Sequence, residues 1–281
     1  MTVQPVSFLS LIGMALTLII SAGVPVALFI RWRRNRDVRI SSLVFGAIVY
    51  YVAAKVLEPT INAAILSNVG GAMMKNMFVY AVYVGLIAVV IEEACRYLTL
   101  KSLVKNVDED NALFFGLGFC SVEAILTAAW PQVSNILNSV LINNGMMGRT
   151  LDMMQEPDLS ATYFAIAPLW ETPSLSFMLA GPERALIILM HICLSLIIFY
   201  FIKSGDKKYL AAALIAHFAV VACSALMSQM GIATVSVLVT AAVTAALAVF
   251  TQRSHKEFEA KRPMGEYAVL ESVGEENVQD N

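Results

Sequence analysis

The sequence has few charged residues for its length of 281. Aspartate, glutamate, lysine and arginine make up 14% of it, and 58% of the residues are hydrophobic. Soluble domains carry about 25% charged residues, so a soluble globular protein is excluded. The net charge of -2 provides no basic surface for nucleic acid. Only four cysteines are present, all within apolar segments, which predicts reduced, buried thiols and no disulfides.

Long apolar runs dominate the chain. The first run lacks the basic start of a cleaved signal peptide and ends at Arg31, so we interpret it as a retained membrane span. About 20 apolar residues suffice to cross a bilayer as a helix. We therefore predict an all-α polytopic membrane protein, a bundle of about seven transmembrane helices. The predicted spans are about 8–30, 40–65, 77–100, 111–141, 183–202, 208–228 and 231–251.

Basic residues orient these spans. Lysines and arginines gather after the first, third, fifth and seventh spans, and cytoplasmic loops of membrane proteins carry such an excess. The amino terminus is then outside and the carboxyl terminus cytoplasmic. Residues 1–251 form the transmembrane domain, with a long extracytoplasmic loop at about 142–182. Residues 252–281 are polar, and we predict a disordered cytoplasmic tail.

Two adjacent carboxylates, Glu92 and Glu93, interrupt the third apolar run. Ionisable groups are costly in the hydrocarbon core and usually have a partner or a function there. Arg96 lies one turn further along and can reach both carboxylates on one side of the helix. The segment is therefore either a functional site or a structural ion-pair network.

Other spans place ionisable groups at a similar depth. With a rise of ~1.5 Å per residue, Glu93 lies ~12 Å from the cytoplasmic end of its span, and Glu123 ~18 Å. His191 lies ~18 Å and His217 ~14 Å from theirs. We predict that these residues share one layer inside the membrane. Glu183 opens the predicted fifth span, and we interpret it as a structural residue that suits the helix dipole.

This set of residues can support hydrolysis. A carboxylate can take a proton from water as general base, and a histidine can donate a hydrogen bond to a developing oxyanion. Two histidines with a glutamate also leave room for a divalent metal, although no HExxH motif selects zinc. We expect no cofactor. A proton-coupled transporter is a further alternative, which the lack of an inverted repeat disfavours.

The order of these motifs resembles the YhfC family of glutamic-type intramembrane proteases, relatives of the CAAX-processing and bacteriocin-processing membrane proteases. The resemblance spans about residues 8–250. Its pieces are Glu92-Glu93-x-x-Arg96, Gly116-Leu117-Gly118 with Glu123, Glu183-Arg184 with His191, and His217.

The resemblance implies an intramembrane endopeptidase of the bacterial plasma membrane that cuts membrane proteins or peptides. It implies that Glu92 or Glu93 activates water and that His191 and His217 support the water or the oxyanion. The predicted supporting residues are Arg96, Glu123 and Phe119.

Two positions depart from the family pattern. Phe119 stands where the family usually has histidine, and Val221 where it usually has aspartate or asparagine. The chain is also similar to the Aph subunit of gamma-secretase, a non-catalytic scaffold that tends to have phenylalanine at the first position. The alternative function is therefore a scaffold that binds a partner membrane subunit.

Overall fold

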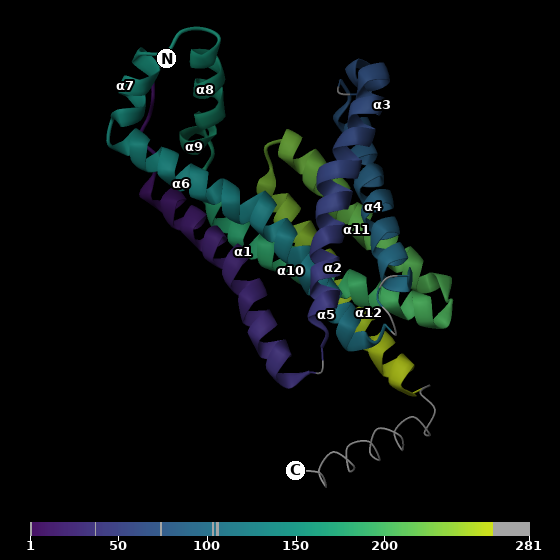
Figure 1. Ribbon diagram of the computed structural model, residues 1–281. Helices are drawn as coiled ribbons and strands as arrows, with labels where there is room; N and C mark the ends of the chain where they lie inside the picture. Colours follow the sequence, from purple (N-terminus) through teal and green to yellow (C-terminus); the bar gives the residue numbers. More distant parts are fainter. Residues whose placement is uncertain (1, 37, 74, 103, 105–106, 261–281) are drawn as a thin grey trace.

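The computed structural model describes residues 2–36, 38–73, 75–102, 104 and 107–260 of the chain (Figure 1). Within this part every regular element is a helix, and seven helical segments are long and apolar enough to cross a membrane. The predicted all-α, multi-pass membrane protein is therefore confirmed. The elements are α1 (Phe8–Asn35), α2 (Ile40–Tyr51), η1 (Val52–Leu57), α3 (Glu58–Met73), α4 (Met77–Ser102), α5 (Glu109–Ala124), η2 (Ile125–Ala129), α6 (Trp130–Asn143), α7 (Met146–Asp152), α8 (Asp158–Ile166), α9 (Pro168–Glu171), α10 (Ser174–Ser204), α11 (Lys207–Gln229) and α12 (Ala233–Ala260).

Helix α10 forms the centre of the bundle. It packs against α1, α4, α5, α11 and α12, which surround it in Figure 1. From His191 to Tyr200 each of its residues is buried, as expected for a helix that is apolar on all sides. Side chains that project from α10 therefore meet those of several neighbouring spans.

Two spans contain a wide π-helical turn shortly before a proline. The turn η1 precedes Pro59, and η2 precedes Pro131. Proline lacks an N–H donor and clashes with the carbonyl group four residues earlier, and a locally wider turn relieves both problems. Glu58 follows the first turn directly, and Glu123 lies just before the second. Both carboxylates thus lie at irregular points of their spans.

Helices α2 and α5 approach each other closely through glycine. A Cβ atom on Gly118 would overlap the carbonyl oxygen of Leu43, and one on Gly46 would overlap that of Phe115. Gly116 faces the other way, where a Cβ atom would lie 2.9 Å from Cβ of Ser195 on α10. Glycine therefore lets α5 lie tightly between α2 and α10, which brings Phe119 and Glu123 close to the central helix.

The outer segment at 142–182 differs from the predicted loop, because it folds into α7, α8, α9 and the start of α10. Helix α10 begins at Ser174, not near residue 183, and includes Pro182. Membrane helices tolerate an internal proline when neighbouring helices satisfy the freed backbone groups. The prediction that Glu183 lies in the first helical turn is therefore wrong, and Glu183 lies well inside α10.

The carboxyl-terminal helix is also longer than predicted. Helix α12 runs to Ala260, beyond the predicted start of a tail at residue 252. Its last turns contact the bundle: His255 Nδ1 lies 2.7 Å from Glu109 Oε1, and the Phe258 ring packs on that of Tyr200. These contacts explain a helix in a polar sequence. The remainder of the predicted tail, residues 261–281, lies outside the described residues.

Candidate functional site

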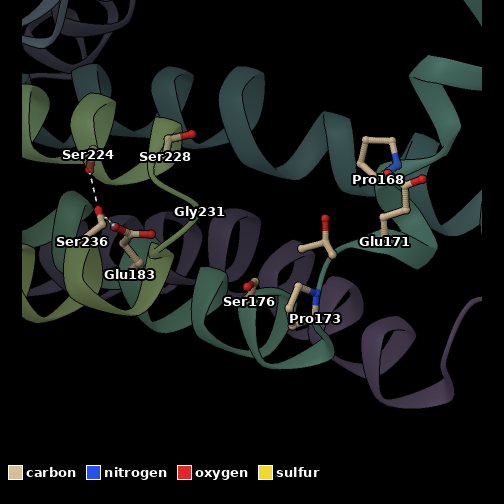
Figure 2. Close-up of a pocket in the computed structure, with 10 residues that line it drawn as sticks. Pro168, Glu171, Pro173, Ser176, Glu183, Ser224, Ser228, Gly231 and Ser236 are labelled. Carbon is tan, nitrogen blue, oxygen red and sulfur yellow. Dashed lines mark hydrogen bonds between the residues drawn. The ribbon is translucent and has the colours of Figure 1, made fainter. Parts of the chain in front are cut away.

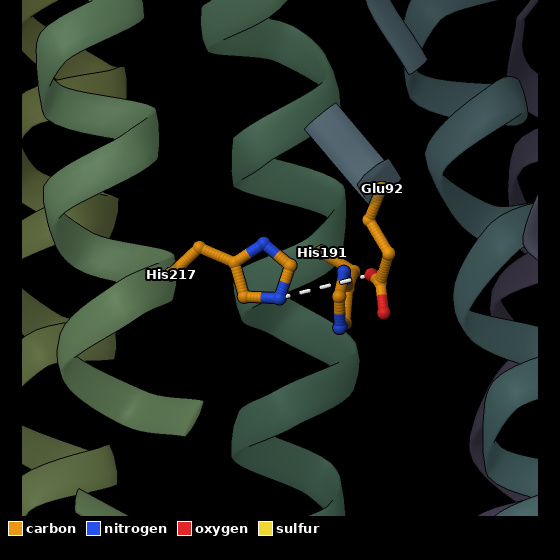
Figure 3. Close-up of side chains that lie close together, drawn as sticks. All are labelled: Glu92, His191 and His217. Atoms are coloured by element: carbon orange, nitrogen blue, oxygen red, sulfur yellow. Dashed lines mark ion pairs between the residues drawn. The ribbon is translucent and has the colours of Figure 1, made fainter. Parts of the chain in front are cut away.

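The structure brings the seven predicted site residues into one buried cluster, which we call the polar cluster. Helix α4 supplies Glu92, Glu93 and Arg96, and α5 supplies Phe119 and Glu123. Helices α10 and α11 supply His191 and His217, whose rings lie 5.2 Å apart between centroids. Figure 3 shows both rings and the Glu92 side chain directed at one another. Glu93, Glu123, His191 and His217, which we predict to share one layer, thus lie together in the bundle.

Arg96 connects three helices and is fully buried (0% exposed). Its Nε donates to Glu93 Oε2 at 3.1 Å, and its Nη1 donates to Ser195 Oγ at 2.6 Å and to the His191 carbonyl at 3.3 Å. The guanidinium carbon lies 4.0 Å from the centre of the Phe119 ring. A guanidinium can make five hydrogen bonds and stack on an aromatic face, so lysine could not reproduce this set of contacts.

The neighbours of His191 define where its ring carries a proton. Nη2 of Arg96 lies 3.0 Å from Nδ1 and can only donate, so Nδ1 is the acceptor. The ring proton is then on Nε2, which lies 3.0 Å from Glu123 Oε2. The other oxygen of Glu123 accepts from Arg184 at 2.8 Å. His191 is thus a neutral ring whose N–H faces a carboxylate.

His217 has the opposite arrangement. Its Nδ1 lies 2.8 Å from Glu93 Oε1, and the Arg96 guanidinium holds Glu93 as the ionised acceptor. The proton is therefore on Nδ1, and the lone pair on Nε2 faces Glu92 Oε2 at 3.7 Å (Figure 3). Glu92 Oε2 is buried without a hydrogen-bond partner. An unpaired buried oxygen is costly, so this atom, like Oε2 of Glu123, is a point of the cluster where a ligand or a reactant can bind.

Glu58 is a member of the cluster that our sequence analysis missed. Its carboxyl group is close enough to that of Glu92 to interact with it electrostatically, and its Oε1 is also buried without a partner. The signal was present, because Glu58 and Pro59 interrupt an apolar run. Its span could not be placed beside α4 from the sequence alone, since the wide turn η1 changes which face Glu58 takes.

Three of these residues can bind a metal ion. Glu92, His191 and His217 each offer one ligand atom, and these atoms lie within 4.8 Å of one another. Two histidines and one glutamate are a known ligand set for catalytic zinc. The unpartnered oxygen of Glu92 and the free lone pair of His217 fit this role. His191 has both nitrogens engaged by Arg96 and Glu123, so it would have to release one of them.

Comparisons with known proteins identify the family of the chain. The model of a family described as YhfC intramembrane metalloprotease matches residues 20–244. The chain is similar to a protein of Bacillus subtilis (strain 168) named uncharacterized membrane protein YhfC, with 29% identity over 255 residues, which cover 86% of this chain and 94% of that protein. No solved structure matches the chain. The family match covers the whole polar cluster.

Proposed function

The chain belongs to the YhfC family of intramembrane metalloproteases, and from this membership and the polar cluster we propose that it is an intramembrane peptidase. Its substrates are membrane proteins or membrane-associated peptides, and its place is the bacterial plasma membrane. The excess of basic residues puts the carboxyl-terminal end of α12 in the cytoplasm. The observation that carries the proposal is Glu92 Oε2, a buried oxygen without a hydrogen-bond partner that faces two histidines.

The contacts favour different roles for the two adjacent glutamates. Glu93 is held by Arg96 and His217, so it positions His217 and is not free to take a proton. Glu92 lacks such partners and is the general base that accepts a proton from water. The Nε2–H of His191 can donate a hydrogen bond to an oxyanion once its contact with Glu123 is broken. This assignment refines the sequence analysis, which left the choice between Glu92 and Glu93 open.

A divalent metal fits the same residues, and Glu92 would then be a ligand of the ion instead of the general base. The sequence alone predicts no cofactor, whereas the family description and the donor set favour a cation held by Glu92, His191 and His217. Such an ion supplies polarisation of the scissile carbonyl group and a more acidic water. Glu93 would then support His217 from behind, in the way that carboxylates orient histidine ligands in metalloproteins.

The test is cleavage of membrane-spanning model peptides by the purified protein in lipid. Glu92→Gln is expected to lower the rate by about 100-fold or more, as loss of a general base does. Glu93→Gln, which removes only support for His217, is expected to lower it by about 10- to 100-fold. Glu156→Gln, in the outer segment away from the cluster, is the matched control and should cleave like the wild type. Equal cleavage by all four proteins would refute the proposal.

A non-catalytic scaffold is the second candidate, and Phe119 favours it. Its fully buried ring covers Arg96 and lies 5.2 Å from the His191 ring, where the family pattern has a polar histidine. A scaffold would co-purify with a partner membrane protein, and Glu92→Gln would not change the amount bound. Robust cleavage by the isolated chain would eliminate this alternative.

A further inference from the structure

A polar pocket of about 630 Å³ opens near α9 (Figure 2). It lies between the first half of α10, the end of α11 and the start of α12. Two carboxylates and four serine hydroxyls give it its chemical character. They are Glu171, Glu183, Ser176, Ser224, Ser228 and Ser236.

Glu183 has hydroxyl partners only. Ser236 donates to its Oε1 at 2.9 Å, and Ser236 is itself 2.8 Å from Ser224 (Figure 2). The adjacent Arg184 is directed at Glu123 instead. Across the described residues, neither Glu183 nor Glu171 forms an ion pair. Ser236 lies in the first turn of α12, whose dipole offers about half a positive charge, less than one carboxylate requires. A membrane span thus carries a carboxyl group for which the described part of the chain supplies no cationic partner.

The chemistry of the lining selects a cation. Carboxylates and serine oxygens accept hydrogen bonds, whereas lysine ammonium and arginine guanidinium groups only donate them. Among the residues that the structure describes, no lysine, arginine or histidine lines the pocket. Its volume lies within the range of about 300–1,000 Å³ found for sites that bind organic ligands, and it is far larger than a single ion needs. The fitting ligand is therefore a basic side chain.

The pocket and the polar cluster are built on the same two helices, α10 and α11. His217, Ser224 and Ser228 are spaced i, i+7 and i+11, which places them on one stripe of this helix. On α10, Glu183 lies eight residues before His191, or ~12 Å along the axis. An extended peptide covers ~3.3–3.6 Å per residue, so this distance corresponds to roughly three or four residues.

We propose that this pocket binds a lysine or arginine side chain of the substrate, three or four residues from the bond that is cut. The inference rests on the proposed peptidase function and specifies its substrate class. Glu183 is the residue that selects the basic side chain, and Glu171, exposed at the rim, adds to the attraction.

The first experiment moves a single lysine along a membrane-spanning model peptide and locates the cleaved bond by mass spectrometry. The cleaved bond is expected to move with the lysine, at a constant separation of three or four residues. Replacement of the lysine by norleucine should slow cleavage at least tenfold for the wild type. Glu183→Gln should remove this preference, and Glu156→Gln, the matched control, should keep it. Cleavage at a bond that does not depend on the position of the lysine would overturn this inference but would still support the proposed peptidase function.

A second experiment tests the pocket without any cleavage. Ser228→Cys places a thiol in its wall, and the rates of modification by cationic and anionic methanethiosulfonates are compared, with the parent protein correcting for native cysteines. The cationic reagent should react at least tenfold faster than the anionic one, and Glu183→Gln should bring the two rates together. A lysine amide should protect the thiol, whereas a glutamate amide should not. Equal rates for the two reagents on Ser228→Cys with Glu183 intact would refute a cation-binding pocket, even if the protein cleaves nothing.

Discussion

Replacement of Arg96 by methionine tests whether this side chain organises the polar cluster. Methionine keeps most of the apolar volume but removes the donors to Glu93, Ser195 and His191, together with the stacking on Phe119. It leaves the Glu93 carboxylate buried beside a histidine alone. Removal of one partner from a buried ion pair costs about 3–5 kcal/mol. We expect a loss in this range for Arg96→Met.

The matched control is Arg184→Met, because Arg184 also forms one ion pair but is partly exposed, with 15% of its side chain accessible. This pair is less deeply buried than the pair of Arg96 and Glu93, so the control should lose less stability than Arg96→Met. The assay is reversible unfolding in mixed detergent and SDS micelles, followed by circular dichroism.

A double variant separates the lost ion pair from lost packing. Addition of Glu93→Gln to Arg96→Met removes the carboxylate that has lost its partner. The double variant should therefore lose about 1–3 kcal/mol less stability than the sum of the losses of the two single variants. Additive losses, or an Arg96→Met variant no less stable than Arg184→Met, would refute the central role of Arg96.

Two further predictions concern packing and metal binding. Gly118→Ala should lose about 1–3 kcal/mol of stability in the same assay, because its Cβ atom would overlap the Leu43 carbonyl group, whereas Gly148→Ala, with open space around it, should be neutral. In equilibrium dialysis the wild type should bind Zn²⁺, and His217→Ala should lower the affinity at least tenfold. His255→Ala should leave the affinity unchanged. Loss of the metal with His255→Ala instead would place the ion at the other end of the bundle.

The membrane class and the common depth of the polar residues could be predicted because both depend on local sequence. Apolar runs of about 20 residues specify spans, and the constant helical rise converts sequence position into depth. Glu93, Glu123, His191 and His217 were placed in one layer on this basis, and the structure shows them in contact. Rotation about each helix axis then follows from where the apolar faces pack.

Features that depend on interrupted helices could not be predicted. A proline suggests a helix boundary, yet α10 continues through Pro182 because its neighbours support the backbone there. Glu58 was missed for a related reason, since the π turn before Pro59 rotates it toward Glu92. Both errors occurred beside a proline, and both concern carboxylates to which we assign a place in the site or in the pocket. Regular periodicity carries no information at such positions.

Phe119 connects the stability of the cluster with its chemistry. The ring covers one face of the Arg96 guanidinium and leaves the edge donors free for Glu93, Ser195 and His191. The attraction between a cation and an aromatic face in a site without water contributes about 2 kcal/mol. On this face Arg96 therefore needs no additional polar partner. Phenylalanine therefore replaces a hydrogen-bonding side chain without leaving Arg96 unsupported. Because the Phe119 ring packs against the ring of His191, the substitution changes the surroundings of that histidine.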